Sequence, residues 1–241
     1  MIELIFVLLH SEQFFTLVVA ATIYFLLIYF LFSNLSFVLA SLIKRPISNK
    51  PIPKHQIKTE ITQSIRSAII FGAGIIVPWL IVKNGYAHIN TKVHIFTLVL
   101  ECIGLIIWND LHFYAVHRLL HAKFKKTHGV HHQSNTSTPF AAYSMSVTEA
   151  VLLGSVMPLA MLFYDFSIQS LIFLTIWSIL INTLSHSNCD FFPKAQADSL
   201  WGFIKHHQQH HSYYNGNYSF FFSQLDRWFG TQQTCNHQEI K

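Results

Sequence analysis

Long apolar runs that contain almost no charged residue constrain the fold of this chain more than any other feature. In a bilayer only helices and closed barrels satisfy every backbone polar group, and a spanning helix needs about 20 apolar residues. Runs of about this length occupy residues 14–32, 65–82, 93–121 and 166–184, and a shorter one occupies residues 151–163. Only 11% of the residues are charged, whereas about a quarter is usual in a soluble domain. The sequence therefore predicts an all-α fold, an integral membrane helical bundle of about four to five spans.

The limits of individual spans are less sharply defined. The first run continues past Ser33 and Asn34, so it is either one long tilted helix or a span followed by an interfacial piece. Pro78 is expected to kink the second run, and the G-x-G at residues 72–74 indicates helix packing. The run at 151–163 is short, so its hairpin with the following run is either re-entrant or fully spanning.

Histidines cluster at helical spacing beside the predicted spans, and residues 110–132 hold six of the sixteen. Residues three and four apart share one face of a helix, so H-x-x-x-H and H-x-x-H-H each direct several imidazoles to one side. Imidazole binds zinc, copper, iron and nickel, and a tetrahedral zinc takes four ligands. A set of nine therefore predicts a cap that holds two metals. The nine candidate ligands are His117, His121, His128, His131, His132, His186, His207, His210 and His211.

The other histidines are weaker candidates for metal ligands. His206 is ambiguous, because it lies four residues before His210 on the same predicted helix face. His112 lies roughly 140° around the helix from His117, so it is expected to face elsewhere. The remaining ones are expected to be surface or interface residues. They are His10, His55, His88, His94 and His237.

Positive charges lie mostly at one end of the predicted bundle. Of the sixteen Lys and Arg residues, six lie within 44–66, four within 118–126 and four from residue 194 onward, and only Lys83 and Lys92 fall at the other end. The positive-inside rule therefore predicts that the histidine clusters and the C-terminus face the cytoplasm. The net charge of +5 fits an anionic membrane surface, and no nucleic-acid partner is expected, because no basic stripe is interleaved with aromatic residues.

The histidine set leaves two classes of metal-binding membrane protein to be weighed. A membrane zinc-dependent lipid hydrolase needs about three ligands and a general base, whereas this chain has many histidines and few acids near them. A metal transporter places its ligands at mid-membrane, where these spans lack histidine. The sequence contains neither the Glu-x-x-His of carboxylate di-iron bundles nor H-E-x-x-H. Three scattered cysteines without C-x-x-C argue against a disulfide framework or a thiolate zinc site.

An ordered set of motifs resembles the fatty acid hydroxylase/sterol desaturase superfamily over about residues 105–231. The motifs are D-x-x-x-Y-x-x-H-R-x-x-H, H-x-x-H-H, H-S-N-x-D-F-F-P, and a second H-x-x-H-H followed by G-N-Y and D-R-W-F-G-T. The resemblance implies an integral membrane, non-haem di-iron oxidoreductase. Such an enzyme uses O2 and two electrons to hydroxylate or desaturate a lipid, which for this chain is a sterol, a fatty acyl chain or a related apolar molecule. It also implies two Fe ions held by the nine histidines named above.

The resemblance carries further expectations for single residues. Asn182 sits where some relatives place another histidine, so it binds metal directly, through water, or not at all. Asp110 and Glu149 are candidates for accepting ring N–H bonds, and the alternative for Asp110 is a salt bridge with Arg118 or a lysine. Ser146 and the following valine replace a His-Pro pair found in many relatives.

The same resemblance suggests how the chain is organised. Residues 1–92 are expected to form an N-terminal transmembrane region with a basic cytoplasmic loop, and residues 93–241 the catalytic domain. No fused haem-binding carrier is present in the sequence, so electrons are expected from a separate donor protein. Residues 187–241 are expected to lie outside the membrane. The phenylalanines at 191–192 and 220–222 either line the lipid's access path or anchor this tail in the membrane interface.

Overall fold

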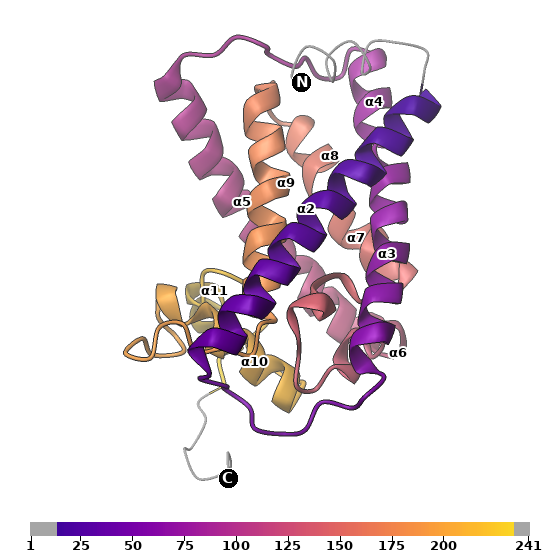
Figure 1. Ribbon diagram of the computed structural model, residues 1–241. Helices are drawn as coiled ribbons and strands as arrows, with labels where there is room; N and C mark the ends of the chain where they lie inside the picture. The colour runs from indigo at the N-terminus through magenta and orange to yellow at the C-terminus, as the bar shows by residue number, and fades with distance from the viewer. Residues whose placement is uncertain (1–13, 234–241) are drawn as a thin grey trace.

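The computed structural model describes residues 14–233, and its regular elements over that range are all helices (Figure 1). Four helical stretches are long and apolar enough to cross a membrane. They are α2 (Phe14–Ile43), α3 and α4 together (Gln56–Gly74 and Ile76–Lys83), α5 (Ile95–Lys123) and α9 (Ile168–Ser185). The prediction of an integral membrane helical bundle is confirmed, with four spans among the described residues.

The first run forms a single helix, because its polar residues find partners without breaking it. The side-chain amide of Asn34 donates to the carbonyl of Phe30 at 2.7 Å, and the hydroxyl of Ser33 donates to the carbonyl of Pro139 at 3.3 Å. At 1.5 Å per residue α2 is about 45 Å long, which exceeds the hydrocarbon thickness of about 30 Å. It runs obliquely across the bundle in Figure 1, as the long tilted helix of the two alternatives.

The second span is interrupted at Ile75, between α3 and α4. Pro78 explains the break, because proline has no N–H to donate to the carbonyl of Gly74 and its ring crowds that carbonyl. Gly72 is needed where α3 crosses α2, since a Cβ there would lie 1.8 Å from the Oγ1 of Thr22. Gly74 has nothing within 4 Å of a Cβ, so only one of the two glycines packs against a neighbouring helix.

The shorter apolar run forms two short helices, α7 (Val147–Gly154) and α8 (Val156–Met161), which together are too short for a regular span. They lead back into α9 through a turn at the end of the bundle opposite the histidines. At that end the backbone of Asn90 pairs with Phe166 and Ile168, and the carboxylate of Glu101 accepts the backbone N–H of Ser167 at 3.0 Å.

Short elements at the other end form a cap (Figure 1). They are α6 (Lys125–His128), η1 (His131–Gln133), η2 (Pro139–Tyr143), η3 (Leu200–Gly202), α10 (Phe203–Tyr213) and α11 (Gln224–Trp228). The expected helical face at His128, His131 and His132 is wrong, because α6 stops before Gly129 and η1 is a separate 3-10 turn. The second H-x-x-H-H does lie on one helix, α10.

The N-terminal helices pack directly on this cap. The hydroxyls of Tyr29 on α2 and Ser64 on α3 both donate to the carbonyl of Phe140, each at 2.9 Å. The buried carboxylate of Glu60 on α3 accepts hydrogen bonds from Ser134 and Thr138. The first two spans therefore form part of the wall that positions the histidine segments.

Candidate metal centre

The structure brings all nine candidate histidines together in two groups, within each of which one ring nitrogen from every histidine lies within 4.8 Å of the others. Histidines from α5, α6, η1, the end of α9 and α10 meet there, and none of the nine is more than 9% exposed. The five-histidine group consists of His117, His121, His128, His132 and His210. The four-histidine group consists of His131, His186, His207 and His211.

Backbone carbonyls fix the tautomer of four of these rings. A carbonyl oxygen can only accept, so the Nδ1 facing it must carry the proton, and in a neutral ring Nε2 then keeps its lone pair. The four pairs are His117 with Tyr218 at 2.8 Å, His131 with Ser144 at 3.2 Å, His186 with Asn182 at 2.8 Å and His210 with Gly216 at 2.7 Å. Each of these rings therefore presents a free Nε2 lone pair to its group.

Two of these lone pairs face each other directly. The Nε2 atoms of His131 and His186 are 3.2 Å apart, although the other nitrogen of each ring already donates to a carbonyl. Burial lowers the pKa of both rings, so both are neutral at pH 7 and neither has a second proton to place between them. A cation shared by the two nitrogens resolves this repulsion, and the donor set therefore fits a metal ion.

The spacing of the nitrogens also fits coordination of one ion per group. Ligands at right angles around an ion about 2.1 Å away lie about 3.0 Å apart, whereas tetrahedral ligands lie about 3.4 Å apart. The observed Nε2 separations are 3.0 Å for His128–His132, 3.1 Å for His132–His210, 3.0 Å for His186–His207 and 3.2 Å for His186–His211. Both ring nitrogens of His121 are buried without a partner, as expected of a ligand.

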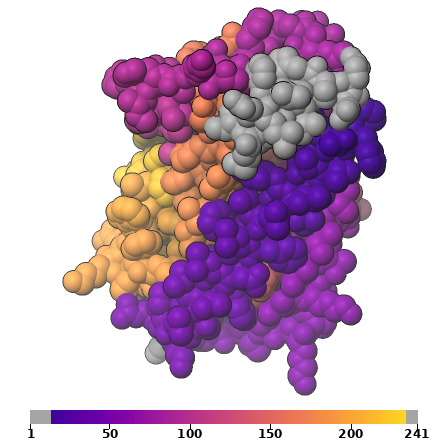
Figure 2. All heavy atoms as spheres, turned by 45° about the horizontal axis from the view of Figure 1, so that its top comes forward, coloured from indigo at the N-terminus to yellow at the C-terminus, as the bar shows by residue number. Residues whose placement is uncertain are grey.

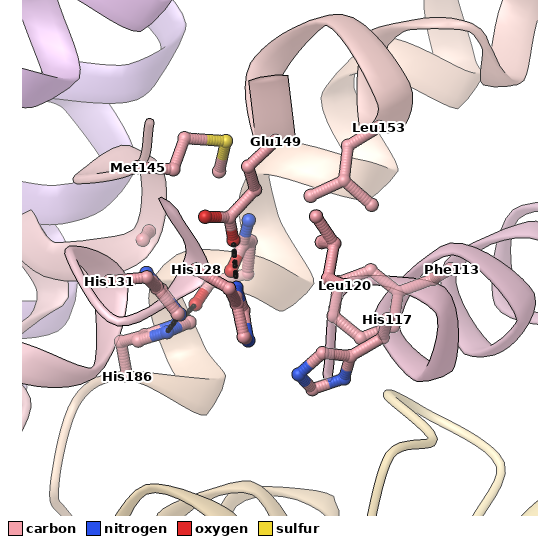
Figure 3. Close-up of a pocket in the computed structure, with 11 residues that line it drawn as sticks. Phe113, His117, Leu120, His128, His131, Met145, Glu149, Leu153 and His186 are labelled. Carbon is pink, nitrogen blue, oxygen red and sulfur yellow. Dashed lines mark hydrogen bonds and ion pairs between the residues drawn. The ribbon is translucent and has the colours of Figure 1, made fainter. Parts of the chain in front are cut away.

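Glu149 is an acidic residue beside the groups, and its Oε1 lies 3.0 Å from Nδ1 of His128, a ring whose pKa burial lowers to about 4 (Figure 3). Burial raises the pKa of Glu149 to about 7, and its Oε2 has no hydrogen-bond partner. Ser146, at the position where relatives carry a histidine, accepts the backbone N–H of Glu149 at 3.2 Å and so begins helix α7.

The other candidates lie near the groups but not in them. The carboxylate of Asp110 accepts the backbone N–H groups of Phe221 at 2.6 Å and Phe222 at 2.9 Å, so it meets neither a ring N–H nor Arg118. His206 forms an ion pair with Asp226 at 2.8 Å and belongs to neither group. Asn182 contributes its carbonyl to His186, and the residue also lines a cavity beside the rings.

The histidines expected to lie elsewhere do so where the structure describes them. His112 contacts Ser155 at 2.9 Å, His88 pairs with Asp165, and His94 caps the start of α5. His55 lies just before α3 and in neither group, whereas His10 and His237 fall outside the described residues. Sequence reasoning missed the carbonyl partners of the rings, because a backbone carbonyl leaves no mark on residue type.

A cavity adjoins both groups on the side of the spans (Figure 3). Its lining combines the apolar side chains of Phe113, Leu120, Met145 and Leu153 with the rings and Glu149. The cavity of about 10 Å³ has room for about one water molecule, so a lipid chain reaches the rings only when these walls part.

Comparison of the sequence with known proteins shows the family of the chain. A sequence model described as fatty acid hydroxylase matches residues 102–231. The Delta(7)-sterol 5(6)-desaturases of Eremothecium gossypii and Candida glabrata are each 28% identical, over 94% and 91% of this chain and 65% and 61% of theirs. The lathosterol oxidase of Homo sapiens is 25% identical over 72% of this chain and 60% of its own.

The chain thus spans 60% to 65% of the length of these three curated relatives. No solved structure gives a significant match. The family match covers more than half of the chain, and every histidine of the two groups falls within it. The chain therefore belongs to the fatty acid hydroxylase family.

Proposed function

We propose that this chain is a membrane-bound, O2-dependent non-haem di-iron oxidoreductase that hydroxylates or desaturates a lipid. The observation that carries the proposal is the convergence of nine buried imidazoles into two groups next to an apolar cavity. The names of the relatives, two sterol desaturases and a lathosterol oxidase, favour a sterol over a fatty acyl chain. Residues 93–241 are the proposed catalytic unit, and residues 1–92 the membrane region that supports it.

The two groups are proposed to hold one iron each. When bound, the iron pair supplies the activation of O2 needed to oxidise an unactivated C–H bond. An all-imidazole donor set suits divalent iron, and five donors exceed what a tetrahedral zinc takes. The protein's own part is to hold the rings in one orientation, since partners of the second ring nitrogen set ligand geometry and basicity.

The residues around the cavity have separate proposed tasks. Leu120, Met145 and Leu153 exclude water and offer an apolar surface to the lipid. Glu149, whose Oε1 lies 3.0 Å from Nδ1 of His128, is proposed to orient that ring so that its Nε2 points into the five-histidine group. Access from the bilayer is consistent with the position of the cavity, whose wall is formed partly by α5 and α9, both of which span the membrane.

The distribution of charge supports a proposed sidedness and a proposed docking site for the electron donor. The histidine end carries most of the basic residues, and Lys123, Lys125 and Lys126 are exposed there. We propose that this end faces the cytoplasm, in accord with the positive-inside rule. A separate electron-donor protein with an acidic surface would be attracted to the same lysines.

Metal content of the detergent-purified chain tests the proposal, after chelation and anaerobic reconstitution with ferrous iron. The informative variants are His131→Ala and His132→Ala, because these neighbours lie in different groups. The wild type is expected to bind about two irons and each variant about one, because each variant removes a ligand from one group only. His112→Ala is the matched control, since it removes a buried histidine that belongs to neither group, and the variant should keep both irons.

Two other outcomes of this measurement would contradict the di-iron centre. One zinc per chain that is lost only in His131→Ala, with no iron uptake, would favour a zinc-dependent lipid hydrolase, because four imidazoles match tetrahedral zinc. No metal retained by the reconstituted wild type would refute the metal centre. Where iron binds, oxidation of a sterol in the presence of O2 and a chemical reductant is the direct test of activity.

A further inference from the structure

The chain after α10 packs on two membrane-spanning helices, although its composition suggested a tail outside the membrane. The ring of Phe221 lies 5.2 Å from Trp177 of α9, and the ring of Phe229 is stacked on Tyr114 of α5 at 5.3 Å. Figure 1 shows α11 beside α9, at the height of its lower end. This segment therefore touches surfaces of α5 and α9 that belong to the spans.

The position of these contacts along the helices gives their depth. Both helices start at the end of the bundle opposite the histidines, and Glu101 in the second turn of α5 is level with Ser167 just before α9, so α5 begins farther out. Along α5, at 1.5 Å per residue, Asp110, which accepts from Phe221, lies about 22 Å from the helix start and Tyr114 about 29 Å. Tilt only shortens these depths, and the hydrocarbon core is about 30 Å thick. Phe221 thus lies within the hydrocarbon layer, and Phe229 contacts α5 at the far boundary of that layer.

Irregular backbone at this depth is stable only when the protein itself satisfies the N–H groups. The carboxylate of Asp110 accepts from Phe221 and Phe222, as described above. The carboxylate of Asp226 accepts the N–H groups of Tyr218 and Ser219, both at 2.8 Å. Both acids are buried, with exposures of 1% and 0%. Two buried carboxylates that hold four neighbouring backbone amides are what an inserted, non-helical segment requires.

The outer surface of the same segment is apolar. Trp228 is 75% exposed and Phe229 57% exposed. On α5, Ile107 and Leu111 are also exposed, so an apolar surface already continues along the spanning helix that Phe229 touches. In Figure 2 the yellow residues of this segment lie at the surface below the magenta start of α5 and beside orange α9. Tryptophan is enriched where headgroups meet hydrocarbon.

We propose that residues 219–229 form a lipid-contacting element, with Trp228 and Phe229 at the boundary between headgroups and hydrocarbon of the leaflet on the histidine side. The occupant of this surface is phospholipid. The element is continuous with the lipid-facing surface of α5, and Asp110 and Asp226 satisfy its backbone. The inference uses only the membrane-spanning character of the chain, so it is independent of the proposed metals and reaction.

Fluorescence quenching in phosphatidylcholine vesicles tests the proposal with the full chain. The chain has five tryptophans, so the signal of Trp228 is taken as the difference between the wild type and Trp228→Phe. Lipids brominated near the carbonyl end of the acyl chain are expected to quench this difference signal strongly. Lipids brominated near the methyl end should quench it less, and aqueous iodide should have little effect, because the indole lies at the interface.

A matched control shows how strongly each quencher acts on an indole that is exposed to water. Lys50→Trp in the Trp228→Phe background places an indole in the exposed loop between α2 and α3, where iodide but not bromolipid should quench. Phe229→Trp in that background reads the neighbouring position and is expected to resemble Trp228. A difference signal that iodide quenches as well as it quenches the Lys50→Trp control would overturn the proposal, whatever metal the chain binds.

Discussion

Replacement of Glu149 by glutamine isolates what the carboxylate contributes to the metal centre. Nδ1 of His128 lies 3.0 Å from Oε1 of Glu149, and both side chains are no more than 2% exposed. The amide oxygen that Glu149→Gln introduces can still accept from the ring, but without charge. Removing such a partner typically lowers metal affinity by about 10- to 100-fold. We expect about tenfold for Glu149→Gln and a value nearer the upper limit for Glu149→Ala, equivalent to about 1.4 and 2.7 kcal/mol.

The stability of the metal-free protein is expected to respond differently. Glu149→Gln removes a buried carboxylate, which favours folding, and introduces an amide NH2 where Oε2 now has no partner, which opposes it. The two effects offset each other, so the free energy of unfolding should change by less than about 1 kcal/mol. A residue that only supports the fold would instead lose stability without a selective loss of metal.

Cobalt titration of the chelator-treated chain, followed by its visible absorption, measures the two sites separately. Only the site built on the five-histidine group should weaken in Glu149→Gln. Glu101→Gln is the matched control, because that buried carboxylate accepts from Ser167 at the opposite end of the bundle and should affect stability alone. Unchanged affinity at both sites, or equal loss at both together with a lower melting temperature, would refute the positioning role.

Three further predictions concern acid stability, helix packing and His206. Burial lowers the pKa of His131 and of His186, so these rings gain protons only on unfolding. The stability of the metal-free protein should therefore fall as pH drops below about 6.5. A melting temperature that stays constant down to about pH 5.5 would contradict this prediction. Gly72→Ala should lower the free energy of unfolding by about 1–3 kcal/mol in a detergent unfolding assay, because its Cβ meets Thr22. Gly74→Ala should not lower it, and equal effects of the two substitutions would argue against the contact with Thr22. His206→Ala should lower the melting temperature without loss of iron, and loss of one iron would place His206 in the centre.

The sequence predicted the membrane bundle and the set of nine histidines because both follow from local rules. Apolar runs long enough to span a bilayer leave little choice of structure, and H-x-x-x-H on α5 places His117 and His121 on one face. The division of the nine into two groups could not be predicted in the same way. His131 and His132 go to different groups because they lie on a separate turn after Gly129, not on the helix that the spacing suggested.

The role of Asp110 was beyond sequence reasoning for a different reason. Its partners are backbone amides more than a hundred residues away, and neither amide leaves a mark on residue type. Glu149 was a candidate from the sequence, but the ring that it contacts depended on where α6 ends and α7 begins. Long-range pairings of this kind follow from the tertiary packing of short elements, for which the sequence pattern holds little information.

Asn182 has two roles beside the four-histidine group. Its carbonyl accepts from the ring of His186, and the residue also lines the cavity. The carbonyl is present whichever amino acid stands there, so this position can change its side chain without losing the bond to the ring. Evolution, or a designer who wishes to reshape the cavity for a bulkier or slimmer lipid, can therefore alter the wall at this point while the ligand beside it stays in place.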